Sequence, residues 1–191
     1  MHPNKFAAAF VANLESEIKT PTTMEEALNC PQRAQWQAAM AAEMGSLQEN
    51  QVYRLVPRPK GKKVMKSKWV FRIKFNADGS VEKYKAIIVA KGFSQVEGED
   101  YDQTFSPTAR FESICQLVAM GASRGLHMHQ MDVTTTFLYA PLEEEVYMEA
   151  SDGTCMPGEA DLVWLLLKCL YGLKQAPRGC NQHIDDVLKG M

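Results

Sequence analysis

The segment 69–75, with the sequence WVFRIKF, most strongly constrains the fold because it alternates large apolar side chains with a valine and two cations. Successive residues of a β-strand point to opposite faces of a sheet, so this period of two predicts a strand with one packed face and one exposed face. The turn sequence Asn76-Ala77-Asp78-Gly79 follows, and the segment 81–90 shows a second strand pattern. Together the two segments predict an antiparallel two-stranded ribbon.

The region of the ribbon carries most of the positive charge of the chain. Residues 54–91 contain 12 of the 21 lysines and arginines but only two acidic residues, a net charge of +10, whereas residues 92–191 have a net charge of −9. This asymmetry is typical of a protein that binds a polyanion in one part and holds cations in another. Charge alone fits equally well a solvated hairpin that acids elsewhere in the fold balance.

Length and composition favour a globular protein. A chain of 191 residues fits one domain or a large part of one, and 46% apolar with 23% charged residues is ordinary for a soluble fold. Five cysteines without a Cys-x-x-Cys pair predict neither a disulfide framework nor a zinc site, and therefore a reducing, intracellular setting, expected to be the cytoplasm. No apolar run reaches the roughly 20 residues that cross a bilayer, so we predict no membrane association. Nothing in the sequence indicates an oligomeric state.

The remaining elements are predicted from caps, breakers and periodicity. Residues 1–21 lack periodicity and are predicted to be a tail or linker, so the domain would span residues 22–191. A capping box at Thr23-Met24-Glu25-Glu26 predicts a helix start, and Pro31 predicts the start of a second helix. That second helix has apolar residues at helical spacing, Trp36, Met40, Met44 and Leu47. Further predictions are a helix over 111–125, strands over 126–133 and 163–167, and a final helix from Pro177.

Several sequence strings, in this order, resemble the copia-type retrotransposon reverse transcriptases. They are KWVFRIK at 68–74, KAIIVAKGFSQ at 85–95, GEDYDQTFSP at 98–107, HQMDV at 129–133, LEEEVYM at 142–148 and LYGLKQAPR at 170–178. The resemblance covers roughly residues 25–191. It implies an α+β fold, namely the fingers and partial palm of a polymerase, with an antiparallel sheet, packed helices and an incomplete C-terminus.

The activity that this resemblance implies is RNA-directed DNA synthesis. The partners would be an RNA or DNA template-primer and deoxynucleoside triphosphates, and the cofactor would be Mg²⁺ or Mn²⁺. Elements of this kind act in virus-like particles and deliver their DNA to the nucleus. Phosphoryl transfer by this route uses two metal ions held by carboxylate oxygens.

Asp132 is the residue that the resemblance implies to be catalytic and to bind metal, since it matches the first metal-binding aspartate of the family. Without the resemblance, an aspartate just before Thr134-Thr135-Thr136 is more typical of a helix cap. His127 and His129 would share one strand face, but no third metal ligand accompanies them, so a structural role is the better interpretation.

The resemblance also implies nucleotide and template contacts. Phe137 matches the aromatic residue that excludes a 2′-hydroxyl by leaving no room for the extra oxygen, although a core aromatic is the alternative. The predicted nucleotide-binding residues are Lys85, Lys91, Val133, Phe137 and Gln175. The predicted template-binding residues are Lys74, Lys174 and Arg178. For each of these cations, an exposed residue with no specific task remains the competing interpretation.

Departures from the family pattern bear on activity. Ile87 stands where the family usually has an arginine, which removes a forked phosphate contact, and Cys180 replaces a tryptophan. Thr136 and Ala140 replace a usual alanine and glycine. The Tyr-x-Asp-Asp motif is expected beyond Met191, and Asp185-Asp186 does not substitute for it because adjacent helical residues point about 100° apart.

We therefore expect this chain alone to be inactive in synthesis. A non-catalytic nucleic-acid-binding remnant of a decayed element is the main alternative, and an expressed relic without function is the third.

Overall fold

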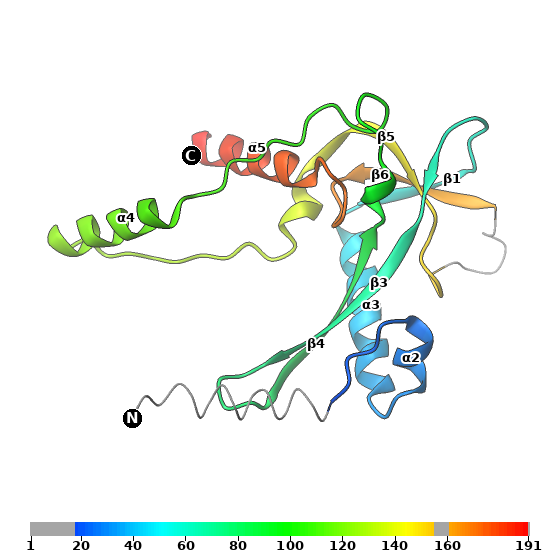
Figure 1. The fold of residues 1–191 in the computed structure, drawn as a ribbon, viewed down its shortest axis with the longest axis horizontal. Coiled ribbons are helices and arrows are strands. Elements are labelled where there is room, and N and C mark those ends of the chain that lie inside the picture. Colours follow the sequence, from blue (N-terminus) through cyan, green and yellow to red (C-terminus); the bar gives the residue numbers. More distant parts are fainter. Residues whose placement is uncertain (1–17, 155–160, 191) are drawn as a thin grey trace.

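The computed structural model describes residues 18–154 and 161–190, so most of the predicted tail, and Cys155, lie outside the described residues. The helices are α2 (Met24–Asn29), α3 (Arg33–Glu49), α4 (Phe111–Ser123) and α5 (Ala176–Lys189), with short 3₁₀ helices η1 (Gly92–Ser94) and η2 (Thr136–Tyr139). The strands are β1 (Tyr53–Pro57), β2 (Val64–Met65), β3 (Ser67–Phe75), β4 (Val81–Ala90), β5 (Pro141–Met148) and β6 (Leu162–Lys168). Helices and mostly antiparallel strands confirm a mixed α and β architecture (Figure 1).

The first two helices begin where the sequence predicts. The Thr23 hydroxyl accepts a hydrogen bond from the Glu26 backbone N–H at 3.1 Å and so caps α2. The Glu26 carboxylate reaches one residue further back and accepts from the backbone N–H of Thr22 at 2.8 Å. Helix α3 starts shortly after Pro31, and its Trp36 is almost fully buried. A cap and an apolar stripe thus account for both helices.

The predicted ribbon is confirmed as β3 paired antiparallel with β4. Trp69, Phe71 and Ile73 lie on its buried face, and the residues between them are exposed. Helix α3 covers this face: the Trp36 ring meets the Phe71 ring edge-on, with 5.3 Å between centroids, and the Tyr84 ring at 4.8 Å. One face of the ribbon therefore belongs to the core, and the other faces solvent.

A second sheet has the strand order β1-β6-β5-β2. The predicted strand 163–167 is confirmed as β6, at the centre of this sheet, with Val163 to Leu166 buried. The pairs β1–β6 and β5–β6 are antiparallel, whereas the short β2 pairs parallel to β5. In Figure 1 this sheet lies at one end of the ribbon, and β3 and β4 extend away from it.

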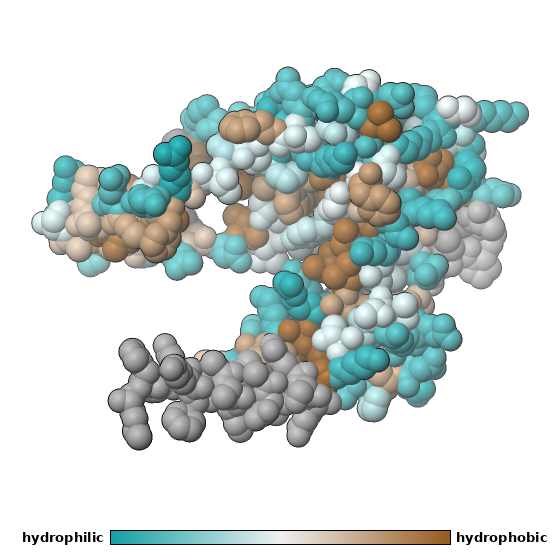
Figure 2. Space-filling view, viewed as in Figure 1, coloured by the Kyte–Doolittle hydropathy of each residue, from teal (hydrophilic) through white to brown (hydrophobic). Residues whose placement is uncertain are grey.

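Helix α4 and the irregular stretches on either side of it form an arm that stands away from the sheets (Figure 1). The arm is joined to the body near Ser106, whose hydroxyl donates to the Pro177 carbonyl at 3.1 Å. The predicted helix is confirmed, but its apolar side chains are exposed, as the apolar residues on the arm in Figure 2 show. The predicted strand 126–133 is wrong: its backbone is irregular. A strand needs a neighbour for its backbone hydrogen bonds, and no described segment pairs with residues 126–133.

No helix among the described residues is long and apolar enough to cross a membrane.

Candidate nucleic-acid and nucleotide site

The outer face of the ribbon carries four cations in two facing pairs, Arg72 opposite Lys85 and Lys74 opposite Lys83. We call these four residues the basic quartet. Directly opposed like charges destabilise an antiparallel pair. Within the described residues, the cations in ion pairs are Arg58, Lys62, Lys63 and Lys189, so no member of the quartet has a carboxylate partner within 4.0 Å. The quartet is therefore a concentration of positive charge that a bound polyanion would relieve.

The same face becomes aliphatic toward the second sheet. Val70 lies directly opposite Ile87, and Lys68 lies opposite Val89. Since Ile87 takes the place of the arginine that the resemblance leads us to expect, the charge on this face is concentrated at the turn end of the ribbon. An anion on this face would therefore contact the cations at the turn end of the ribbon and alkyl side chains toward the second sheet.

Helix α3 brings a carboxylate to the edge of β4. The Glu43 side chain accepts a hydrogen bond from the backbone N–H of Ile88 at 3.2 Å. Burial raises the pKa of Glu43 above its ordinary value, and the Ile88 hydrogen bond and the charge of Lys85 offset part of that rise. Glu43 thus satisfies an edge amide and acts electrostatically on one member of the quartet.

Asp132 lies exposed in the irregular part of the arm, four residues before η2. It is not the cap of that helix, because the cap residue is Thr135, which has a left-handed φ of 55° and makes no side-chain capping bond. An exposed carboxylate suits a hard cation such as Mg²⁺. However, no three His, Cys, Asp or Glu side chains gather as a metal site within residues 18–154 and 161–190. Asp132 and the two histidines therefore do not form a complete metal centre.

Phe137 lies on η2, half-buried, and its ring meets the Tyr171 ring edge-on with 4.7 Å between centroids. Tyr171 also binds the end of the ribbon, since its carbonyl accepts a hydrogen bond from the Ala90 N–H at 2.8 Å. Burial raises the pKa of Tyr171, and the charges of Glu43, Cys180 and Asp132 add to that rise in decreasing order. Tyr171 therefore joins the end of the ribbon to Phe137, and the charge of Asp132 acts on it electrostatically.

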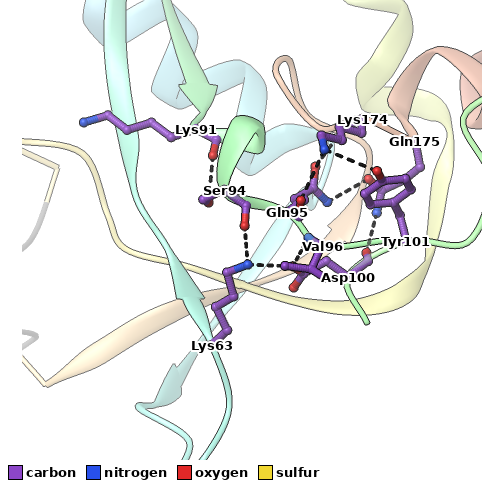
Figure 3. Close-up of polar contacts among 9 residues, drawn as sticks. All are labelled: Lys63, Lys91, Ser94, Gln95, Val96, Asp100, Tyr101, Lys174 and Gln175. Carbon is purple, nitrogen blue, oxygen red and sulfur yellow. Dashed lines mark hydrogen bonds and ion pairs between the residues drawn. The ribbon is translucent and has the colours of Figure 1, made fainter. Parts of the chain in front are cut away.

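Gln175 is placed elsewhere, in a buried network that Figure 3 shows. Its side-chain oxygen accepts from the Gln95 amide at 2.9 Å, and its amide donates to the Asp100 carbonyl at 3.2 Å. The Lys174 ammonium donates to the Gln95 carbonyl and to the Tyr101 hydroxyl, each at 3.2 Å. These contacts occupy both predicted ligand-binding side chains and join the loop after η1 to the loop before α5.

Lys63 also belongs to this network, through Ser94 and Asp100 (Figure 3). Its ammonium donates to the Ser94 carbonyl and pairs with the Asp100 carboxylate at 2.8 Å. The Lys91 carbonyl accepts from the Ser94 hydroxyl at 2.9 Å, but in Figure 3 the Lys91 side chain points away from the network. The Lys91 ammonium is therefore the part of this region that remains open to a ligand.

Arg178 lies on α5 and lines a cavity of about 500 Å³ together with Asp102, Glu143, Glu144 and Asp186. Four carboxylates around one guanidinium make this wall acidic. Val133 is exposed beside Asp132. Asp132, Val133 and Phe137 thus lie in or next to η2, and Lys74 and Lys85 lie on the ribbon. The structure places the other three predicted residues elsewhere: Gln175 is buried, Lys174 is exposed but hydrogen-bonded within the network, and Arg178 lines the acidic cavity.

Two residues of this region were missed from the sequence. Tyr171 lies within the string LYGLKQAPR, so its position in a shared motif was an available signal. Glu43 gave no signal, because a glutamate on an otherwise ordinary helix looks like a solvated residue until the packing against β4 is known.

Comparison with known proteins identifies the family. Residues 50–191 match the family described as reverse transcriptase (RNA-dependent DNA polymerase). The chain is 44% identical over 176 residues to the retrovirus-related Pol polyprotein from transposon TNT 1-94 of Nicotiana tabacum, covering 92% of this chain and 13% of that protein. It is 36% identical over 188 residues to the corresponding polyprotein from transposon RE1 of Arabidopsis thaliana, covering 97% and 12%.

The chain thus spans about an eighth of the length of these relatives. No solved structure matches it. The matched family and the two polyproteins agree with the resemblance carried by the motifs, and the chain therefore belongs to the reverse transcriptase family of copia-type transposon Pol polyproteins.

Proposed function

We propose that the described fold is the fingers and first part of the palm of a reverse transcriptase, and that the outer face of its ribbon holds the phosphates of a template strand. The basic quartet carries this proposal, because two directly opposed pairs of cations, none with a carboxylate within 4.0 Å in the part of the chain that the structure describes, are costly unless an anion binds them. Lys74 belongs to the quartet. Lys174 and Arg178 are left out of the template contact, since one is bound within the network and the other lines an acidic cavity.

The nucleotide site in this proposal lies where the ribbon meets η2. Lys91, directly after β4, would bind the triphosphate, and Phe137 with Val133 would lie along the sugar. Lys85 lies opposite Arg72 in the quartet, away from this end of the ribbon, and is therefore assigned to the template contact. Asp132 would hold Mg²⁺, which when bound neutralises charge on the reacting phosphates and activates the primer hydroxyl. The exposed carboxylate supplies one hard oxygen ligand, so the parent activity, RNA-directed DNA synthesis, needs a second carboxylate motif.

We therefore infer that this chain binds primed template without extending it, inside the cell that carries the element. A non-catalytic nucleic-acid-binding remnant is the second candidate function. It is favoured by Ile87, whose alkyl side chain faces Val70 where the family has an arginine.

Primer extension combined with template binding tests the proposal. The purified chain is mixed with a fluorescent primer-template, deoxynucleotides and Mg²⁺, and both incorporation and anisotropy are recorded at several salt concentrations. We expect salt-sensitive binding without incorporation. Incorporation that disappears in Asp132→Asn would show that the chain is itself an enzyme. If no binding is detected even at low salt, about 10 to 50 mM, the proposed nucleic-acid function is wrong altogether.

A further inference from the structure

Tyr171 is the point at which three separate parts of the chain meet. Its carbonyl is bound to Ala90 at the end of β4, its ring contacts Phe137 of η2, and it lies close enough to Glu43 of α3 for an electrostatic interaction.

The backbone at this point has little freedom. Gly172 has a φ of +93°, and a Cβ built on it would lie 2.2 Å from the Ala90 carbonyl oxygen. The chain therefore passes β4 at a distance that only glycine allows. Because Tyr171 precedes this crossing and is hydrogen-bonded to Ala90 at 2.8 Å, its Cα is fixed relative to the ribbon.

The Tyr171 ring contacts the Phe137 ring and so restrains its position. The two ring planes are inclined by 78°, the edge-to-face arrangement that aromatic pairs prefer. Phe137 lies on the short 3₁₀ helix η2, which the buried Leu138 anchors in the core, whereas the Phe137 side chain itself is only half-buried. Tyr171, whose backbone is bound to Ala90, therefore limits the movement of the Phe137 ring.

We propose that Tyr171 is a positioning residue for deoxyribose selection: its ring holds the Phe137 ring against the sugar of the bound nucleotide. This inference rests on the proposed nucleotide site. A ring that excludes a 2′-oxygen must resist displacement by a fraction of an ångström, and the edge contact with Tyr171 opposes such a displacement. The role needs the ring and not the hydroxyl, so phenylalanine at position 171 should serve equally well.

The test compares binding of dATP and ATP, each with Mg²⁺, by saturation-transfer NMR, which detects weak ligands. The wild-type chain should prefer dATP. Tyr171→Leu should reduce that preference by about 2- to 10-fold, the range expected for loss of one aromatic pair, and Tyr171→Phe should restore it. Tyr139→Leu is the matched control, because Tyr139 lies on the same 3₁₀ helix but is 47% exposed. Template affinity should not change in any of these variants.

A double-mutant cycle with Phe137→Leu separates positioning from general structure. If Tyr171 acts through Phe137, the double variant should have the same preference as Phe137→Leu alone. Additive losses would overturn the inference, and so would an unchanged preference in a folded Tyr171→Leu. If that variant does not fold, Tyr171→Met replaces it in the cycle. A wild-type chain that binds neither nucleotide would instead refute the proposed nucleotide site, and with it this role.

Discussion

Removing charge from the ribbon should weaken nucleic-acid binding and at the same time stabilise the protein. The variant Lys74→Gln/Lys83→Gln removes one of the two opposed pairs of the basic quartet. Like charges directly opposite each other cost about 0.2 to 1 kcal/mol, so the free energy of unfolding should rise by about that amount. Affinity should fall while stability rises, because the repulsion between the cations destabilises the free ribbon and is relieved when phosphates bind.

The magnitude of the binding effect follows from counterion release. Four contacts to a single strand give a slope of log K against log salt of about −2.8, and two contacts give about −1.4. Between 50 and 200 mM KCl, the wild-type chain should therefore lose about 50-fold in affinity and the variant about 7-fold.

Fluorescence anisotropy with a labelled single-stranded oligonucleotide measures the slope, and urea denaturation at low salt measures stability. Urea is needed because guanidinium would screen the repulsion. The control Lys60→Gln/Lys168→Gln removes the same charge from positions outside the ribbon and should leave the slope unchanged. A slope that falls equally in the control, or a ribbon variant less stable than wild type, would refute the reasoning.

Three further predictions concern the scaffold of the site. Trp36→Ala should lower the free energy of unfolding by about 3 to 5 kcal/mol in urea titrations, because the ring fills the space between α3 and the ribbon; a loss below 1 kcal/mol, roughly that of a surface residue, would contradict this. Glu43 has a raised pKa, so its contribution to stability is complete below about pH 4.5 and is lost as pH rises through its folded pKa. Glu43→Gln should therefore flatten the plot of unfolding free energy against pH above about pH 4.5, and an unchanged plot would contradict this prediction. Gly172→Ala should lower the melting temperature more than Gly98→Ala, since both glycines have positive φ but only the Cβ at 172 meets the Ala90 carbonyl; equal losses would mean that backbone strain alone decides.

The sequence predicted the helices and strands that are determined by residues close together in the chain. The Thr23 cap, the helical spacing around Trp36 and the alternation of the ribbon each describe a structure formed within a few residues or across one tight turn. Their positions agree with the structure to within a residue or two. The buried strand β6 was also recognisable, because a short continuous apolar run is typical of a central strand.

The roles of side chains at the site were less predictable from the sequence, because they depend on which segments, far apart in the sequence, pack against one another. Gln175 and Tyr171 lie four residues apart in one motif, yet Gln175 is buried against Gln95 and Asp100, whereas Tyr171 contacts Phe137. The spacing in the motif gives no indication of which side chain faces η2. That choice is made by the crossing of Gly172 over Ala90, a contact between residues far apart in the sequence.

The arm shows the same distinction between local and distant information, with a consequence for Asp132. Helix α4 forms because its hydrogen bonds are internal, even though Ile114, Leu117 and Val118 remain exposed. The segment 126–133 was predicted to be a strand but has no partner among the described residues, and a strand cannot satisfy its backbone alone. Asp132 belongs to this segment, so its position is fixed from one side only, by η2. Any strand that paired with residues 126–133 would fix the carboxylate from both sides and would leave the ribbon unchanged.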